Sequence, residues 1–246
     1  MARKSSIQHI KEMSERYGNE IRSSIRNTMV RENTTEPEGE GKIPEILLEE
    51  TDSVSAVFMY AADDTAVLNF ANYTEPGGGY LYYGAVAQEE ALCSESTLYN
   101  VLSGRMEYYK ANRRDENSDL YYDRGLFSPG IIFERDSETV ECAVITVAAP
   151  NRDFARLRGI SEERNATALK ERIRFILNMA EREGVKTLIL GAFGCGAFSQ
   201  DPHAVSEEFR TLLRSGKYGF EKVVFAIPNQ RSENYRVFRD AIYKNK

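Results

Sequence analysis

A run of glycines followed by acidic residues has the clearest chemical potential in this sequence. Three consecutive glycines at positions 77–79 are followed, after eight residues, by a glutamine and two glutamates at 88–90. Glycine enters backbone conformations with positive φ and lets the main chain approach a ligand closely. Successive N–H groups of such a loop can converge on an anion such as a diphosphate. A phosphate site beside an acid is what cleavage of a nucleotide sugar requires, although a simple turn and a pair of surface glutamates are the ordinary alternatives.

A second glycine-rich loop, GAFGCGAF, runs from Gly191 to Phe198. It follows an apolar segment, KTLIL, and precedes a helix expected from Pro202, a setting in which backbone N–H groups and a helix dipole can bind phosphate. A tight strand-to-helix turn explains it equally well. Neither loop matches a P-loop or a dinucleotide-binding fingerprint. Phe198, just past the last glycine, is either a core residue or an aromatic that stacks on a ribose or base.

The two acids are too close in sequence to form the facing carboxylate pair of a two-acid glycosidase. Adjacent residues of a helix project about 100° apart. One of Glu89 and Glu90 can therefore transfer the proton while the other orients sugar hydroxyls. The helix N-terminus lowers a carboxyl pKa, and burial beside a bound diphosphate raises it; we expect the second effect to dominate in the complex. Tyr80, Tyr82 and Tyr83 form either a packed loop or contacts to a ligand's sugar or adenine.

Composition restricts the remaining possibilities. The 246 residues, 41% hydrophobic and 28% charged, predict a soluble globular protein with a sizeable core. A net charge of −6 argues against a general nucleic-acid binder. No apolar run could span a membrane, no secretory signal is evident, and three scattered cysteines favour a reducing cytoplasm. His9 and His203 are far apart and no cysteines have zinc-finger spacing, so we expect no metal site, and a capping or surface role for His203.

Hydrophobic periodicity predicts alternating strands and helices in a single domain. Such alternation of apolar strands with helices indicates an α/β sandwich with a largely parallel or mixed sheet, in which ligands collect at the carboxyl ends of strands. Both glycine loops fall at such ends. A polar linker is expected at 33–42 and an irregular region at 103–130. The expected helices are 4–31 (one or two), 53–61, 86–102, 165–183, 202–214 and 235–243, and the expected strands are 43–49, 65–71, 131–135, 142–148, 186–190 and 223–227.

The stretch PGGGYLYYGAVAQEEALCSESTLY resembles the signature of the microbial-type poly(ADP-ribose) glycohydrolases, whose catalytic core is a macrodomain. The segments LNFAN, SPG near Ser128, VAAPN at 147–151 and GAFGCGAF are similar to further elements of that family in the same order. The resemblance covers roughly residues 5–245. It implies a macrodomain-like three-layer α/β/α sandwich with a mixed central sheet, in which residues 1–42 form an N-terminal helical extension and residues 43–246 the core.

The same resemblance implies hydrolysis of the ribose–ribose O-glycosidic bond of poly(ADP-ribose), with release of ADP-ribose. Glu90 would protonate the departing 2′-oxygen and then deprotonate the attacking water, and Glu89 would position ribose hydroxyls. The negative diphosphate favours an oxocarbenium-like transition state, so no metal, cofactor or protein nucleophile is needed. The substrate-binding residues that it implies are Asn69, Asn72, Gly77, Gly78, Gly79, Gln88, Gly194, Cys195, Gly196, Ala197 and Phe198.

One departure from the family pattern concerns the substrate range. The segment YLYYG is bulkier than the small residues expected there, which bears on whether long polymers fit. Asp52, which follows a predicted strand, is a candidate partner for the adenine amine. The alternatives are a hydrolase of single ADP-ribosyl groups on protein or nucleic acid, and a non-catalytic ADP-ribose reader, which the intact acids disfavour. The expected partner is ADP-ribose or its polymer, free or on modified proteins; we expect a monomer without sequence-specific nucleic-acid or membrane binding.

Overall fold

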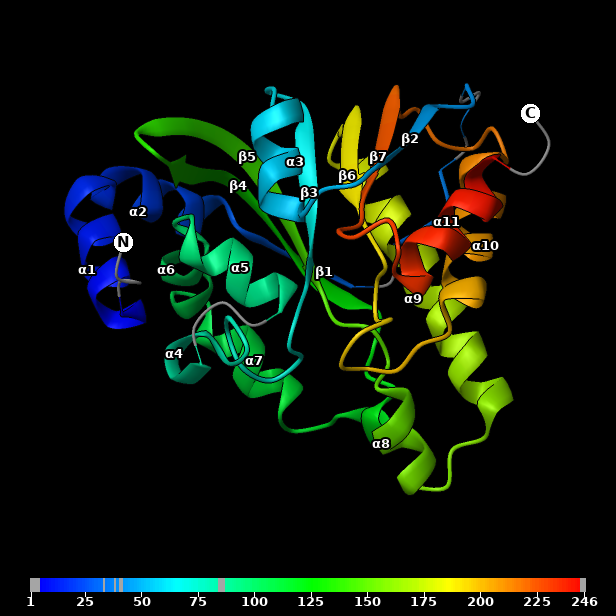
Figure 1. Cartoon of the computed structure of the whole chain (residues 1–246). Coiled ribbons are helices and arrows are strands. Elements are labelled where there is room, and N and C mark those ends of the chain that lie inside the picture. The colour runs from blue at the N-terminus through cyan, green and yellow to red at the C-terminus, as the bar shows by residue number, and fades with distance from the viewer. Residues whose placement is uncertain (1–4, 33, 38, 40–41, 84–86, 244–246) are drawn as a thin grey trace.

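The computed structural model describes residues 5–32, 34–37, 39, 42–83 and 87–243 as an α/β protein built on one seven-stranded sheet (Figure 1). Start positions 4 and 86 of two expected helices, and part of the expected linker 33–42, lie outside the described residues. The strands are β1 Met29–Glu32, β2 Glu45–Glu49, β3 Thr65–Phe70, β4 Arg124–Arg135, β5 Glu138–Val147, β6 Thr187–Leu190 and β7 Lys222–Ala226. The helices are α1 Ser6–Arg16, α2 Gly18–Asn27, α3 Ser53–Tyr60, α4 Tyr80–Tyr83, α5 Gln88–Ser94, α6 Leu98–Ser103, α7 Met106–Asn112, α8 Arg152–Leu157, α9 Glu162–Arg182, α10 Pro202–Leu213 and α11 Glu233–Tyr243.

The sheet is mixed, as expected. Its strand order is β1-β4-β5-β3-β6-β7-β2. The strands from β5 to β2 in this order are parallel to their neighbours, whereas β4 is antiparallel to both β1 and β5. The carboxyl ends of the parallel strands therefore face the same edge, and β3 and β6, which precede the two glycine loops, are adjacent at that edge.

Helices cover both faces of the sheet and make three layers (Figure 1). Successive residues of β3 alternate between the two faces: Leu68 packs into the core beneath α9, α10 and α11, and Val67 packs into the core beneath α3, α5 and α6. The two N-terminal helices pack outside this second layer, against α6 and β4. The predicted three-layer sandwich with an N-terminal helical extension is confirmed. No helix among the described residues is both long and apolar enough to cross a membrane.

Several elements differ from the sequence prediction, and for some of them tertiary pairing overrides the local pattern. The expected helix 86–102 is divided into α5 and α6, since Ser96 between them pairs with Phe133 of β4. The last part of the expected N-terminal helix is instead β1, which pairs with the first half of β4. That half of β4 and α7 lie in the region 103–130, which was expected to be irregular. Helices α4 and α8 were not predicted. The other expected helices and strands are confirmed within a few residues at each end.

Candidate active site

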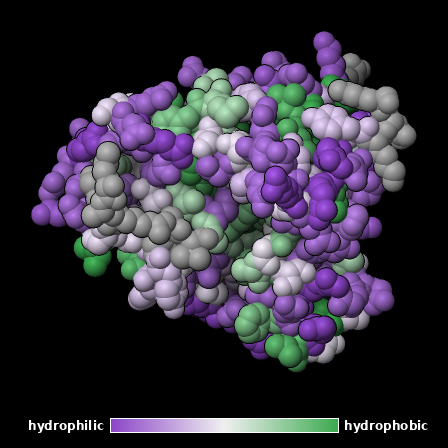
Figure 2. Space-filling model, in the orientation of Figure 1, coloured by the Kyte–Doolittle hydropathy of each residue, from purple (hydrophilic) through white to green (hydrophobic). Residues whose placement is uncertain are grey.

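A pocket of about 600 Å³ opens at the carboxyl ends of β3, β6 and β7. In the orientation of Figure 1, the molecular surface is hollowed near its centre, with apolar residues visible between polar rims (Figure 2). Both glycine loops and the first turn of α5 reach the pocket. The lining comes from residues 52–54, 70–72, 78–79, 87–91, 149, 192–194, 196–198, 226–228, 232 and 234.

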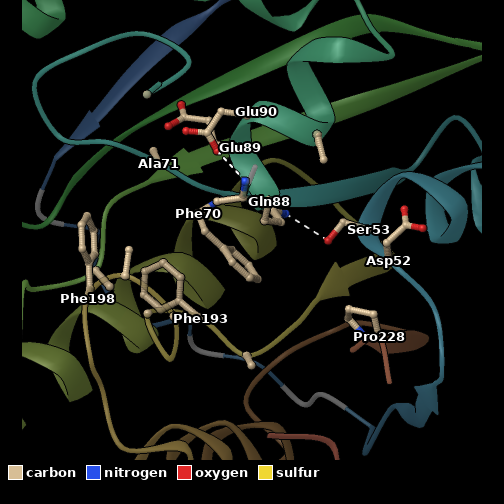
Figure 3. A pocket seen from close by; sticks show the side chains of 18 of the residues that line it. Asp52, Ser53, Phe70, Ala71, Gln88, Glu89, Glu90, Phe193, Phe198 and Pro228 are labelled. Atoms are coloured by element: carbon tan, nitrogen blue, oxygen red, sulfur yellow. Dashed lines mark hydrogen bonds between the residues drawn. The ribbon is translucent and has the colours of Figure 1, made fainter. Parts of the chain in front are cut away.

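Gln88 fixes the first turn of α5 to the central strand. The β3–β6 pairing ends at Val67 and Ile189, so the backbone of β3 beyond this point needs other partners. The Gln88 side chain supplies them: its Oε1 accepts the Phe70 N–H at 2.8 Å, and its Nε2 donates to the Leu68 carbonyl at 2.7 Å. Nε2 also donates to Ser53 Oγ at 3.0 Å (Figure 3). The start of α5, and with it both glutamates, is thereby held at the edge of the sheet.

Glu89 is buried beneath the triple-glycine loop, with 3% of its surface exposed. Its carboxylate accepts the main-chain N–H of Asn72 at 2.7 Å and of Gly77 at 3.2 Å, and the Asn69 amide at 3.2 Å. Burial raises the pKa of Glu89 to about 8, although these hydrogen bonds oppose the shift. Asn69 has no exposed surface and lies outside the pocket lining, so in this structure it supports Glu89. Direct contact of Asn69 with a ligand stays a prediction.

Glu90 is half-buried and lines the pocket. Its Oε1 accepts the Gly79 N–H at 2.8 Å and its Oε2 accepts the Ala87 N–H at 3.1 Å, the second being the helix-capping contact of a glutamate at the third helical position. A Cβ on Gly78, whose φ is +53°, would lie 2.8 Å from Glu90 Oε1. The glycine run is therefore needed for the close approach of this carboxylate.

The N–H groups of the first glycine loop serve internal carboxylates, which sequence reasoning did not foresee. Gly77 donates to Glu89 and Gly79 donates to Glu90, whereas the Gly78 N–H reaches the Glu75 carbonyl at 3.3 Å. Gly78 and Gly79 line the pocket and Gly77 does not. Contact of these glycines with a diphosphate stays a prediction, and the loop's observed role is to hold the two acids.

The second glycine loop offers free backbone donors. The N–H groups of Gly196, Ala197 and Phe198 form no hydrogen bond with any residue in the described part of the chain, and all three residues line the pocket. A Cβ on Gly196 would meet no atom within 4 Å, so this part of the backbone is open. Gly194, with φ of +74°, also lines the pocket and packs closely on Ala149. Cys195 lies outside the lining, its thiol directed to the Phe193 carbonyl at 3.6 Å.

Phe198 is held by aromatic rings behind it. Its ring lies edge-on to Tyr121, with centroids 6.2 Å apart, and Tyr121 stacks on Tyr73 at 4.3 Å. Tyr121 has a φ of +60°, a conformation that costs a non-glycine residue free energy and persists only where the surroundings enforce it. The buried Arg172 contributes by donating to the neighbouring Leu120 carbonyl at 3.3 Å. Phe198 therefore has a firm support on the wall that faces Glu90 (Figure 3).

Other predicted residues occupy different places. Asn72 lines the pocket, and its Oδ1 accepts the N–H groups of the following turn. Asp52 lines the pocket at the end opposite Glu90 and caps α3, accepting the Ser55 N–H at 2.9 Å (Figure 3). Tyr80 is buried, with its hydroxyl 2.8 Å from His9 Nδ1. His203 is exposed at the start of α10, where Asp201 accepts its N–H, as predicted.

Several pocket residues were missed by sequence reasoning. Phe70 and Phe193 pack edge-to-face, with centroids 5.8 Å apart, on the wall between the two loops. Ile227, Pro228 and Asn234 also line the pocket, and Pro228 lies at the end near Asp52 (Figure 3). The signal for Phe70, Phe193, Ile227 and Pro228 was their position at or just after the carboxyl ends of β3, β6 and β7, whereas Asn234 lies in the first turn of α11. Among the described residues, no group of three His, Cys, Asp or Glu side chains could hold a metal ion.

A family model for the microbial-type PARG catalytic domain, where PARG is poly(ADP-ribose) glycohydrolase, matches residues 3–136 and so more than half of the chain. The chain belongs to this family. The predicted resemblance is confirmed, and the protein is an enzyme of the glycohydrolase class. The matched range includes the triple glycine and both glutamates, whereas the second glycine loop lies beyond it.

Solved PARG structures resemble the chain over nearly its whole length. PARG from Thermomonospora curvata is 28% identical, with a TM-score of 0.83 and coverage of 96% of this chain and 97% of that one. The same protein bound to the inhibitor ADP-HPD gives a TM-score of 0.78 at 28% identity, with 98% of both chains covered. PARG from Deinococcus radiodurans in complex with ADP-ribose is 30% identical, with a TM-score of 0.80 and coverage of 91% and 97%. Among curated proteins, none matches significantly.

Proposed function

We propose that this microbial-type PARG binds the terminal unit of poly(ADP-ribose) in its pocket and uses Glu90 as a single general acid and base to release ADP-ribose. The observation that carries the proposal is the placement of the Glu90 carboxylate. It is fixed by the Gly79 and Ala87 N–H groups at one end of a pocket of about 600 Å³. That volume suits a ligand of this size, since such sites span roughly 300–1,000 Å³. The D. radiodurans relative was solved with ADP-ribose bound.

The pocket offers a different chemistry for each part of ADP-ribose. Adenine would lie at the end formed by Asp52 and Pro228, whose carboxylate and apolar ring suit an amine and an aromatic base (Figure 3). The diphosphate would accept the open N–H groups of residues 196–198. The distal ribose would then lie between Phe198 and Glu90, with Glu89 beneath.

The reaction needs one proton donor at the leaving oxygen. A protonated Glu90 gives its proton to the 2′-oxygen as the bond from the distal ribose C1″ breaks and the bonding electrons pass to that oxygen. The negative diphosphate stabilises the oxocarbenium-like sugar. The Glu90 carboxylate then takes a proton from the water that attacks C1″, which releases ADP-ribose and restores the acid. These steps balance without a metal ion or a protein nucleophile.

The decisive experiment compares the wild type with Glu90→Gln on purified poly(ADP-ribose), with free ADP-ribose as the readout. The glutamine keeps the shape of the side chain but removes the proton transfer, so we expect turnover to fall by about 10²–10⁴-fold. ADP-ribose affinity, measured by calorimetry, should stay within about twofold. A wild type that releases no ADP-ribose, or a variant with undiminished turnover, would contradict the proposal. If Glu90→Gln loses its affinity for ADP-ribose and the wild type shows no turnover, the protein would be a non-catalytic reader.

A second candidate, removal of single ADP-ribosyl groups from a modified protein, would use the same atoms. The sequence raised this candidate through the bulk of the segment YLYYG, which includes Tyr82 and Tyr83. Parallel assays on polymer and on a serine-linked mono-ADP-ribosyl peptide separate the two candidates. A protein that turns over only the peptide would replace the first proposal with the second.

A further inference from the structure

Two exposed tyrosines follow the first glycine loop, and the ring of one of them, Tyr83, lies near the proposed catalytic carboxylate. Tyr82 and Tyr83, on the short helix α4, are 81% and 76% exposed, and their ring centroids lie 6.2 Å apart. A Cβ built on Gly79 would lie 2.8 Å from Tyr83 Cδ2 and 3.4 Å from Glu90 Oε1. The ring and the carboxylate therefore approach the same point of the backbone. Two neighbouring aromatic rings left in water beside a pocket are a feature that calls for a ligand.

The proposed reaction places the leaving group at this position. A general acid must lie within hydrogen-bonding reach of the oxygen that it protonates. The pocket extends from Glu90 toward Asp52 and Pro228, so the bound unit occupies that direction (Figure 3). The departing unit must then lie on the other side of Glu90, where α4 is. The ring of Tyr83 is consequently within reach of whatever carries the leaving oxygen.

The chemistry of the polymer identifies the group that would meet the rings. In a ribose–ribose linkage of poly(ADP-ribose), the departing 2′-oxygen belongs to a ribose that carries adenine on the neighbouring carbon, C1′. An adenine is thus always two bonds from the leaving oxygen's carbon. Tyrosine rings bind bases by stacking, and this contact tolerates water on the open side. A serine or aspartate side chain as leaving group would bring no base.

We propose that Tyr82 and Tyr83 form a subsite that stacks on the adenine of the departing unit and so favours polymer over single ADP-ribosyl groups. This inference rests on the proposed function and adds the feature of the substrate that lies outside the pocket. Tyr80, one residue before the pair, does not take part, because its ring is buried and its hydroxyl contacts His9. The bulk of YLYYG is then a means of holding the polymer.

The test measures polymer hydrolysis and ADP-ribose affinity in Tyr82→Leu, Tyr83→Leu and the double variant. Because stacking contributes a sizeable part of base binding, we expect kcat/KM on poly(ADP-ribose) to fall by about 5- to 100-fold in the double variant, mainly through KM. The Kd for ADP-ribose, which fills only the pocket, should not change, and neither should the Tm. Tyr83→Phe keeps the ring and should retain wild-type turnover.

Phe154→Leu is the matched control, since Phe154 is a 55% exposed aromatic residue on α8, on the opposite side of the lower part of the molecule from α4 (Figure 1). It should hydrolyse polymer like the wild type. A loss in this variant instead of the tyrosine variants would place the departing unit over α8 and overturn the assignment. Unchanged or faster polymer hydrolysis by the double leucine variant would also overturn it. Absence of polymer turnover in the wild type would instead refute the proposed function itself.

Discussion

At the scale of single residues, two neighbouring carboxylates share one glycine loop but have different environments. Glu89 is buried and receives three N–H groups, whereas Glu90 is half-buried and opens into the pocket. The angle of about 100° between adjacent helical residues separates them. The burial of Glu89 suits a residue that holds the loop, and the exposure of Glu90 suits proton exchange with a substrate.

Gly196 offers a clean test of backbone contact with the diphosphate. Its Cβ position is open and its φ is not positive, so Gly196→Ala should fold with an unchanged Tm. The added methyl group would keep an anion from the N–H groups of the loop, and losing one charge-assisted hydrogen bond costs about 1.5–3 kcal/mol. We therefore expect ADP-ribose, titrated by calorimetry, to bind at least about tenfold more weakly.

Gly194→Ala is the contrasting variant. Gly194 has a φ of +74°, and a Cβ there would lie 2.8 Å from the Ala149 Cβ, so this substitution should lower the Tm. Equal affinity of Gly196→Ala and wild type for ADP-ribose would show that the second glycine loop does not receive the diphosphate.

The candidate residues could be found from the sequence, but the partners of their backbone groups could not. The glycine run, the acids and Phe198 all stand out by type and spacing. That Gly77 and Gly79 donate to the glutamates depends on how α5 docks on β3, which no local pattern records. The role of Phe70 could not be predicted either, because an apolar residue at the end of a strand is typical of the core, whereas Phe70 lines the pocket.

At the scale of elements, the side chain of Gln88 joins α5 to β3. Gln88→Met keeps the length of the side chain but removes the amide that forms hydrogen bonds with the Phe70 N–H and the Leu68 carbonyl. Unpaired buried polar groups cost about 1–3 kcal/mol each, so we expect the free energy of unfolding in urea to fall by roughly that amount. The turn that carries Glu90 should also loosen, which lowers kcat.

Gln8→Met, at an exposed position of α1 where the side chain donates to Glu12, is the matched control and should leave both quantities unchanged. A Gln88→Met variant with wild-type stability and kcat would show that α5 is positioned by other contacts.

Elements with strong apolar periodicity were predicted, and those made by long-range pairing were not. Helix α9 and strand β3 carry continuous apolar patterns and are confirmed. Strand β1 has four residues and exists because β4 pairs with it. The middle of β4 contains Pro129 and Gly130, which are typical of a turn, and the strand accommodates them at a change of register. Local signals could not show that these segments join a sheet.

At the scale of the whole molecule, the alternation of strands and helices was enough to predict the layers and the edge at which the site lies. The parallel strands β3 and β6 are adjacent in the sheet, so loops that are more than a hundred residues apart in sequence meet at one pocket. This arrangement buries an acid, Glu89, beneath the first glycine loop. That acid connects the site to the stability of the entire fold.

Burial of Glu89 should make the free energy of unfolding depend on pH. Its pKa is raised from an ordinary 4.5, which it regains on unfolding, to about 8 in the folded state. Between these values the folded protein holds a proton that the unfolded chain releases. The contribution of Glu89 to stability therefore falls as pH rises through this window, by at most about 1.4 kcal/mol per pH unit.

Glu89→Gln imitates the protonated form and removes this pH-dependent contribution. Urea unfolding from pH 5 to 8 should show the wild type losing stability relative to Glu89→Gln, whereas the exposed control Glu138→Gln should follow the wild type. Parallel curves for wild type and Glu89→Gln would show that Glu89 stays ionised in the fold, held by its three N–H donors.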